Sequence, residues 1–379
     1  MKQNDRLMEI MVSSRTYPMV SAATLLWGAS KLYGGLMQVR RKLYEKQVLP
    51  SYLLPCPVVS IGNLSLGGTG KTPMVIHLAR MISGMGHRVA IISRGYKGSA
   101  QNKGAVVCDG STLRCDMAQS GDEPYLIAQL LGDIPVVVGK DRYRAGKRAS
   151  KISQPEVILL DDAFQHLRLK RDLNLLLLDA GAPLGNSFVI PRGRLREPAG
   201  AIGAADAVVF TRSESIQPSS LEAVTGQYPV LPVFRSVHRT VIRGMADAGT
   251  PLPSLCHLQA GPAGLEDLIM FAFSGLADNQ AFLDTIRRQR AQLAGERGFA
   301  DHHAYSDREI DQIGQAAGLA GADYLVTTDK DYVRIAGKAC FPKPLVVLGV
   351  EIEFPDDDSA WRRFIKEKVG MMIHQRRER

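Results

Sequence analysis

A glycine-rich loop between an apolar run and an amphipathic segment constrains the fold of this chain most strongly. The loop follows Val58-Val59-Ser60-Ile61 and precedes Met74-Val75-Ile76-His77-Leu78-Ala79. Its residues are Ser65, Leu66, Gly67, Gly68, Thr69, Gly70, Lys71 and Thr72. Glycines let the backbone curl so that N–H groups point at phosphate oxygens, and the N-terminus of the following helix adds positive potential. This order of strand, loop and helix predicts a nucleoside triphosphate site on an α/β fold.

Two side chains of the loop have expected roles in holding the nucleotide. Lys71 can reach the β- and γ-phosphates, and Thr72 can coordinate Mg²⁺. The loop departs from the usual pattern because Ser65 stands where a first glycine is common, while Gly67 and Gly68 provide conformational freedom later. The alternative is a glycine-rich turn without a ligand, but the Lys-Thr pair and the flanking elements favour a phosphate-binding loop (P-loop).

Apolar strand candidates alternate with helical stretches along most of the chain. They lie at Val58–Ile61, Val89–Ser93, Pro135–Val138, Val157–Leu160, Leu173–Leu178 and Ala207–Thr211. Such alternation predicts a mostly parallel sheet with helices on both faces and ligands at the carboxyl ends of the strands. The weaker pattern from Ser213 to Leu255 suggests a connector. A smaller α/β unit then resumes, with strands expected at Ile269–Ser274, Tyr324–Thr328 and Leu345–Val350 and helices starting at Asp278 and after Ser306.

Two adjacent carboxylates, Asp161 and Asp162, end the apolar run at 157–160. In P-loop proteins such a strand lies beside the loop and places an acid near Mg²⁺. Neighbouring side chains of an extended strand point in opposite directions, so both reach the metal only if the chain turns here. The alternative is a pair of solvated acids at a strand end. His166 follows closely and could orient water or phosphate, or be a structural histidine.

A second acidic pair, Asp122 and Glu123, lies between Gly121 and Pro124 at an expected helix start. A carboxylate held there could accept a proton from an attacking hydroxyl, as general-base catalysis requires. Spacing alone favours another interpretation, in which Asp122 caps the helix and Pro124 lies in its first turn.

Arginine-rich segments and a histidine pair are further candidates. Residues 140–144, which include Arg142, and residues 191–198 could grip phosphates through guanidinium groups, or simply form a basic surface. The pair His302-His303 follows Asp301 and precedes a capping box at Ser306–Glu309. No third ligand recurs at metal-site spacing, so zinc is not expected. The favoured hypothesis is one histidine that contacts a carboxylate across a cleft between domains, and the alternative is a loop histidine without a role.

Composition restricts the partners and the compartment. Of 379 residues, 45% are hydrophobic and 22% are charged, which is typical of a globular protein. The formal net charge of +9 favours anionic partners such as a nucleotide, a phosphorylated substrate or anionic lipid. Only 6% of residues are aromatic, with few among the arginines, which argues against nucleic acid. Five cysteines without a CxxC pair indicate a reducing compartment.

The N-terminal region suggests attachment to a membrane. Residues 16–30 are uncharged and mostly apolar, but Lys31 interrupts them, and a spanning helix needs about 20 apolar residues. Apolar residues recur at helical spacing through this region; they are Leu25, Leu32, Leu36, Val39 and Leu43. A basic cluster, Arg40-Arg41-Lys42, lies at its C-terminal end. This pattern predicts an interfacial helix whose basic end meets anionic headgroups. The alternative is a helix packed on the globular body, and whether the segment spans stays open.

Taken together, these segments resemble the tetraacyldisaccharide 4′-kinases, the lipid A 4′-kinases of Gram-negative bacteria. The resemblance runs from about Leu32 to about Arg334 and depends on the order and spacing of several motifs. These motifs are Ile61-Gly62-Asn63-Leu64, the loop at Gly67–Pro73, Ser93-Arg94-Gly95-Tyr96, Gly121-Asp122-Glu123-Pro124, Leu160 to His166, Leu195-Arg196-Glu197, Phe273 to Ala277 and Asp301-His302. The family's loop also places its glycines late, so Ser65 fits the resemblance.

The resemblance implies a kinase that uses ATP and Mg²⁺. It would transfer the γ-phosphate of ATP to the 4′-hydroxyl of a tetraacyldisaccharide 1-phosphate, giving lipid IVA in lipid A biosynthesis. Carried over by position, Asp122 would be the general base, assisted by His302. Lys71 and the loop amides would hold the phosphates, and Thr72 with Asp161 or Asp162 would bind Mg²⁺. The remaining residues that would line the site are Tyr96, Glu123, Arg142, His166 and, as a weaker match, Glu197.

The same resemblance implies a domain plan and a location. Residues 1–50 would be a membrane-associated helical segment, 51–235 the P-loop kinase domain, and 236–379 a smaller α/β domain that closes over the active site. The partners would be the glycolipid substrate and the surface of the inner membrane, on its cytoplasmic face, with no nucleic acid and no obligate protein partner. Attachment would be peripheral or monotopic.

A second class of function fits part of the pattern. A membrane-associated P-loop NTPase switch or metallochaperone would hydrolyse its nucleotide to control the binding of a partner. Guanine-specific members use an Asn/Thr-Lys-x-Asp element, which Thr328-Asp329-Lys330-Asp331 resembles weakly, without the leading Asn and in the second domain. Formation of a phosphorylated lipid product distinguishes a kinase from such a switch.

Overall fold

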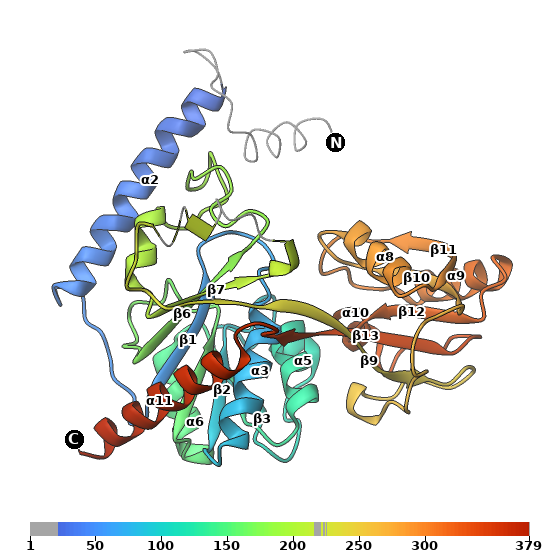
Figure 1. Ribbon diagram of the computed structural model, residues 1–379. Coiled ribbons are helices and arrows are strands. Elements are labelled where there is room, and N and C mark those ends of the chain that lie inside the picture. The colour runs from blue at the N-terminus through green and yellow to red at the C-terminus, as the bar shows by residue number, and fades with distance from the viewer. Residues whose placement is uncertain (1–21, 216–220, 223, 225, 379) are drawn as a thin grey trace. The chain divides into compact units, whose positions relative to one another are not determined.

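The computed structural model describes residues 22–378 except 216–220, 223 and 225. Residues 16–21, the first part of the expected apolar stretch at 16–30, therefore lie outside the described residues. The chain divides into two compact units. Unit 1 contains the described residues up to Arg94, Gly139–His238 and Ile352 onward, and unit 2 contains Gly95–Val138 and Arg239–Glu351. Strands β9 (Val237–Ala246) and β13 (Leu345–Glu353) each pass from one unit to the other (Figure 1).

Both units are built from segments that are distant in sequence, unlike the contiguous division expected at residues 235/236. That expected boundary lies close to His238, where β9 leaves unit 1. Residues 95–138, however, belong to unit 2, because Leu126 of α5 (Asp122–Leu131) is buried in its core. Helix α11 (Asp358–Arg377) belongs to unit 1, where Trp361 Nε1 donates to His77 Nε2 at 3.1 Å. The division into units could not be predicted from hydrophobic periodicity, because periodicity does not indicate which distant segment a helix packs against.

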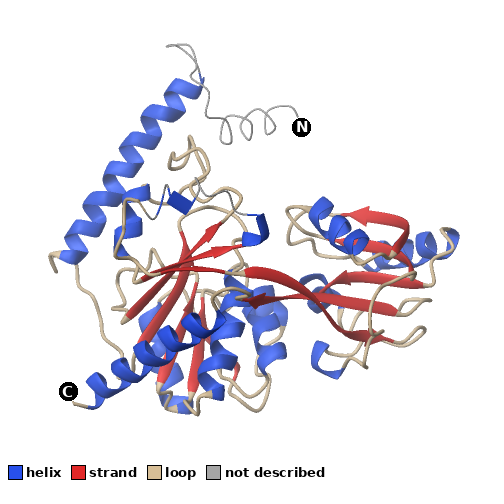
Figure 2. Ribbon diagram, viewed as in Figure 1, coloured by secondary structure: helices blue, strands red, loops and turns tan. Residues whose placement is uncertain are grey.

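In unit 1, the parallel α/β sheet expected from the sequence is present. Its strands run in the order β2-β5-β1-β6-β7-β8. Their bounds are β1 Val58–Asn63, β2 Val89–Ser93, β5 Val157–Asp161, β6 Leu173–Asp179, β7 Ala207–Thr211 and β8 Val233–Arg235. Every residue of β1, β2, β5 and β7 is buried, as expected for parallel strands covered on both faces (Figure 2).

Helices and apolar loops cover this sheet. Helix α3 (Lys71–Gly84) packs along β1, β2 and β5, and α6 (Arg142–Ser153) packs along β2. A further apolar cluster joins Leu176 of β6 and Phe210 of β7 to the 3₁₀ turn Ala199–Ala204. A second 3₁₀ turn spans Ser213–Ser215.

Unit 2 has its own sheet, with strand order β11-β10-β12-β13-β9. Its strands, besides β9 and β13, are β10 Ile269–Ser274, β11 Gln292–Gly298 and β12 Tyr324–Thr328; its helices, besides α5, are α4 Met117–Ser120, α8 Asn279–Arg288, α9 Asp307–Leu319 and α10 Asp329–Ile335, with a 3₁₀ turn at Leu255–His257. Strands β3 (Ala105–Cys108) and β4 (Val136–Val138) pair antiparallel.

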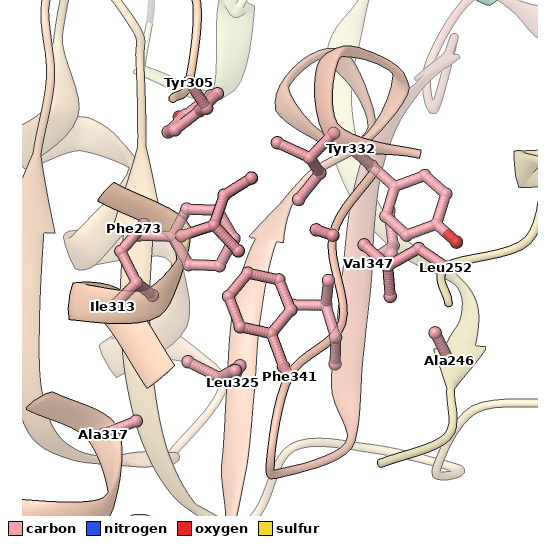
Figure 3. Close-up of a cluster of buried hydrophobic side chains, with 14 of the residues drawn as sticks. Ala246, Leu252, Phe273, Tyr305, Ile313, Ala317, Leu325, Tyr332, Phe341 and Val347 are labelled. Atoms are coloured by element: carbon pink, nitrogen blue, oxygen red, sulfur yellow. The ribbon is translucent and has the colours of Figure 1, made fainter. Parts of the chain in front are cut away.

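Side-chain alternation along β10 explains why helices lie on both faces of this second sheet. Phe271 and Phe273 share a cluster with Ile313 of α9, whereas Met270 and Ala272 share a different cluster with α8. Figure 3 shows the first cluster, with the ring of Phe273 close to Tyr305 and Phe341.

The sequence predicted the long buried strands and missed the polar ones. Helix α8 is capped by Asp278, and α9 begins with the expected capping box at Ser306 and Glu309, so both helix starts are confirmed. The expected connector instead contains β9, whose residues are mostly half-buried. Strands β3, β8 and β11 were also not predicted, because their partly exposed residues give no continuous apolar run.

Candidate active site

The backbone of the P-loop has the curvature that phosphate binding requires. Gly67 and Gly70 have φ angles of +116° and +77°, in the region that favours glycine. A Cβ atom on Gly70 would lie 2.5 Å from His238 Nε2, so only glycine fits there. Gly70 caps α3, which places Lys71 and Thr72 in its first turn. The Thr69 Oγ1 atom is buried and has no hydrogen-bond partner among the described residues.

The two carboxylates after β5 have different surroundings. Asp161 is buried, and its Oδ2 accepts a hydrogen bond from Ser93 Oγ at 2.9 Å. Asp162 has a φ of +47°, so the chain turns there and the two side chains need not point in opposite directions. Lys71 Nζ lies 3.7 Å from Asp162 Oδ1, and Arg196 Nη1 donates to both Asp162 oxygens at 2.9 and 3.0 Å. Burial opposes ionisation of Asp162, but Lys71 and Arg196 outweigh it and lower its pKa.

Arg142 and His166 lie in the same unit as the loop. Burial lowers the pKa of Arg142 to about 10, against the attraction of Asp161, and its guanidinium donates to Gly139 O at 2.9 Å. Burial and the nearby Arg142 lower the pKa of His166 to about 4, so this imidazole is neutral at physiological pH. Neither side chain is a solvated surface group, which removes the basic-surface alternative for Arg142.

Glu197 connects the loop region to the N-terminal helix. Helix α2 (Ala22–Glu45) is held by Ser30 Oγ, which donates to Val189 O at 2.8 Å, and by Arg41 Nε, which donates to Glu197 Oε2 at 3.2 Å. The same 189–197 segment reaches the P-loop, because Leu66 N donates to Arg194 O at 2.7 Å. Glu197 is therefore engaged with α2.

This donor set fits a nucleotide with a magnesium ion. The loop itself carries groups suited to binding phosphate, namely the buried Thr69 hydroxyl, the backbone turn at Gly70 and the Lys71 ammonium. Across residues 22–378, outside the gaps, no group of three or more His, Cys, Asp or Glu side chains is arranged to hold a metal. Mg²⁺ needs no such group, since it is usually held by one or two carboxylates, water and substrate phosphates.

In unit 2, the structure pairs Asp122 with His302. His302 Nδ1 lies 2.7 Å from Asp122 Oδ2, and the Asp122 side chain is 14% exposed. Burial opposes the Asp122 carboxylate, but hydrogen bonds from His302 and Arg334 outweigh it and hold its pKa well below its usual range. The hydrogen bond to Asp122 raises the pKa of His302 despite partial burial. The division at residues 235/236 puts these residues in different domains, whereas the structure places both in unit 2.

The start of α5 differs slightly from the capping interpretation. Gly121 is the N-cap residue and makes no side-chain capping bond, while Asp122 is the first helical residue and its Oδ1 accepts from Glu123 N at 2.9 Å. Glu123 forms an ion pair with Lys330 at 3.3 Å. Tyr96 is half exposed, and its ring lies in a T-shaped arrangement with that of His302 at a centroid distance of 6.3 Å.

The structure therefore groups the predicted site residues in two sets. One set, in unit 1, contains the P-loop, Asp161, Asp162 and Arg142, with His166 and Glu197 nearby; the other, in unit 2, contains Tyr96, Asp122, Glu123 and His302. Sequence reasoning missed Arg196 and Arg334 as partners of the key acids. Arg196 stood next to Glu197 in a recognised motif, and Arg334 stands three residues after Asp331 on α10, but neither spacing indicates which acid it meets.

Comparisons with known proteins identify the family of this chain. Residues 22–370 match the family model described as Tetraacyldisaccharide-1-P 4′-kinase. The chain is 41% identical to the tetraacyldisaccharide 4′-kinase of Pelobacter propionicus over 88% of this chain and 89% of that one, and 38% identical to that of Desulfatibacillum aliphaticivorans over 96% and 97%. The solved structure of LpxK from Aquifex aeolicus in complex with ATP has a TM-score of 0.73 and 31% identity, covering 92% of this chain and 100% of that one. This chain belongs to the tetraacyldisaccharide 4′-kinase family.

Proposed function

We propose that this chain is an ATP-dependent kinase that phosphorylates the 4′-hydroxyl of a tetraacyldisaccharide 1-phosphate, giving lipid IVA. Family membership over most of the chain supports the substrate class. The observation that carries the proposal is the Asp122–His302 pair, because a carboxylate held ionised beside a histidine suits proton removal from an alcohol.

In this mechanism the described side chains orient the reactants. Lys71 and the P-loop amides hold the β- and γ-phosphates, and Arg142 adds positive charge. Thr72 and Asp161 or Asp162 are the groups that would hold Mg²⁺, which when bound neutralises phosphate charge. The substrate hydroxyl donates a hydrogen bond to Asp122. Its oxygen forms a bond to the γ-phosphorus as the bond to the bridging oxygen breaks, ADP leaves, and the proton passes to Asp122.

A transfer assay tests the proposal directly. Full-length protein is incubated with γ-labelled ATP and Mg²⁺ and with disaccharide 1-phosphate in detergent micelles. We expect label in the lipid fraction in amounts equal to the ADP formed. ADP formation without labelled lipid, at the same rate with and without the acceptor, would refute the kinase and favour a nucleotide switch.

Membrane association at the cytoplasmic face, with a glycolipid substrate, is part of the proposal. Within the part of the chain that the structure describes, no helix is both long and apolar enough to cross a bilayer. Helix α2 instead leaves a row of apolar side chains exposed along one side; their exposed fractions are 78% for Leu25, 69% for Leu32, 56% for Leu36 and 56% for Val39. The row ends near Arg40, Arg41 and Lys42, which suits an anionic lipid surface.

We expect the double substitution Leu32→Ser and Leu36→Ser to weaken binding to vesicles of phosphatidylglycerol and phosphatidylethanolamine about 10-fold or more. Burying one leucine side chain stabilises by about 1.5–3 kcal/mol, so losing two at an interface has at least that effect. Vesicle flotation measures it. Leu319→Ser on α9, where leucine is 91% exposed, is the matched control and should bind like the wild type. Equal binding by all three proteins would exclude α2 as the attachment site.

A further inference from the structure

The carboxylate of Asp122 has more partners than a histidine–aspartate pair needs. Its Oδ2 atom accepts from His302 Nδ1 at 2.7 Å and from Arg334 Nη2 at 2.5 Å. Its Oδ1 atom accepts only from Glu123 N, at 2.9 Å, among the contacts that the structure gives it. A carboxylate oxygen has two lone pairs, so Oδ2 is fully used and Oδ1 keeps one lone pair for another donor.

Arg334 is itself held rigidly on α10. Its side chain is 4% exposed, and Nη1 donates to Asp331 Oδ1 at 2.8 Å and to Gly275 O at 3.3 Å. A guanidinium fixed by two acceptors on one nitrogen presents its other nitrogen in a defined direction. That other nitrogen points at Asp122.

Asp331 in turn is fully buried, and both of its carboxylate oxygens accept hydrogen bonds. Its Oδ1 accepts from Tyr305 Oη at 2.9 Å and from Gly275 N at 3.0 Å, and its Oδ2 accepts from Thr328 Oγ1 at 2.7 Å. Figure 3 shows that Tyr305 lies at the edge of the apolar cluster of unit 2. This chain of contacts connects Asp122 through Arg334 to the packed core, and it gives the Thr328–Asp331 segment a role unrelated to guanine binding.

We infer that Arg334, oriented by Asp331, is a positioning residue for phosphoryl transfer: it occupies Oδ2 of Asp122 and so leaves Oδ1 to receive the proton of the substrate hydroxyl. This inference rests on the proposed function, in which Asp122 is the base. Arg334 also supplies a permanent positive charge, because arginine stays protonated at all physiological pH values. Asp122 therefore stays ionised and oriented even when His302 loses its proton.

The charged groups around Asp122 determine how kcat should depend on pH when Arg334 is removed. They are His302 and Arg334 on Oδ2, the Glu123–Lys330 pair beside it on α5 and α10, Asp331 behind Arg334, and Asp301 next to His302. Without Arg334, His302 becomes the one cation in direct contact with Oδ2 among the described residues. Its charge, which is lost as pH rises through its pKa, would then decide how firmly Asp122 is held.

The test uses full-length R334M, R334K and, as control, R243M. Arg243 is a partly buried arginine of unit 2, paired with Asp329 at 3.3 Å and Glu351 at 2.7 Å, but it does not contact Asp122. For R334M we expect kcat to fall about 100-fold with the KM for ATP within about two-fold, since misplacing a reacting group by about 1 Å has an effect of that size. R334K should recover to within about 10-fold of wild type, and R243M should keep its kcat even where its Tm falls.

Two further readouts separate positioning from mere stability. The kcat of R334M should fall as pH rises through the pKa of His302, while wild-type kcat should not, and added guanidinium should raise the kcat of R334M. If folded R334M keeps kcat within about three-fold, or if R243M loses as much as R334M, the inference is wrong. Should R334M not fold, R334Q is the deciding variant, with the same expectations. A wild-type protein that makes no labelled lipid would instead refute the proposed function.

Discussion

Substitution of Asp122 by asparagine is expected to lower kcat about 1,000-fold while the KM for ATP stays within about two-fold. The amide has nearly the same shape but cannot accept the hydroxyl proton, and general-base catalysis contributes about 10²–10⁴ in rate. Steady-state kinetics with varied ATP and saturating disaccharide measure both constants. Asp116→Asn is the matched control, because Asp116 caps α4 in the same unit and asparagine caps helices equally well.

The same variant predicts a change in stability with a defined pH dependence. The pKa of Asp122 is lower in the folded protein than in the unfolded chain, so its ionised contacts stabilise the fold above the usual carboxyl pKa. This stabilisation is lost as pH falls through the range between the unfolded and folded values. The difference in Tm between wild type and Asp122→Asn should therefore be largest near neutral pH and shrink in acid. An equal loss of ATP affinity and kcat would instead assign Asp122 to nucleotide binding.

Substitution of Lys71 by methionine is expected to lower kcat about 100- to 1,000-fold and to weaken ATP binding as well. The ammonium group neutralises charge that develops on the transferred phosphoryl group, and removing one such group has an effect of this size. The Asp162 side chain should stay in place, because Arg196 still donates to both its oxygens. Transfer assays and calorimetric titration with ATP measure the two effects.

The matched control for this variant is Lys170→Met, an exposed lysine of the same unit. It removes one positive charge without touching the loop, so both kcat and ATP affinity should match the wild type. Wild-type kcat in Lys71→Met would mean that the loop does not hold the transferred phosphate, and the proposed reaction would fail with it.

The elements that local patterns could predict are those whose signal lies in consecutive residues. The P-loop, the buried strand before Asp161 and the capping box at Ser306 are each specified by a few neighbouring residues. Each is found where it was expected. The sequence indicated only that a turn was needed for both Asp161 and Asp162 to reach the metal. It could not predict the turn at Asp162, since a positive φ in a non-glycine residue produces no sequence pattern.

Long-range placement could not be predicted in this way. The grouping of Asp122 with His302, 180 residues away, follows from packing of α5 on α10, which depends on the whole core of unit 2. Arg334 lies 212 residues from Asp122, and nothing in its neighbours distinguishes it from a surface arginine. The family resemblance supplied the roles of Asp122 and His302, but not the partner that orients them.

The segment 189–197 contacts both helix α2 and the P-loop of unit 1. It contacts α2 through Val189 and Glu197, and Arg194 O accepts a hydrogen bond from Leu66 N of the P-loop. Arg196 N donates to Leu64 O, one residue before the loop. The proposed membrane attachment of α2 is therefore linked to the P-loop through this one segment of chain. If lipid binding moves α2, the affinity for ATP should therefore differ between the protein in solution and the protein on vesicles.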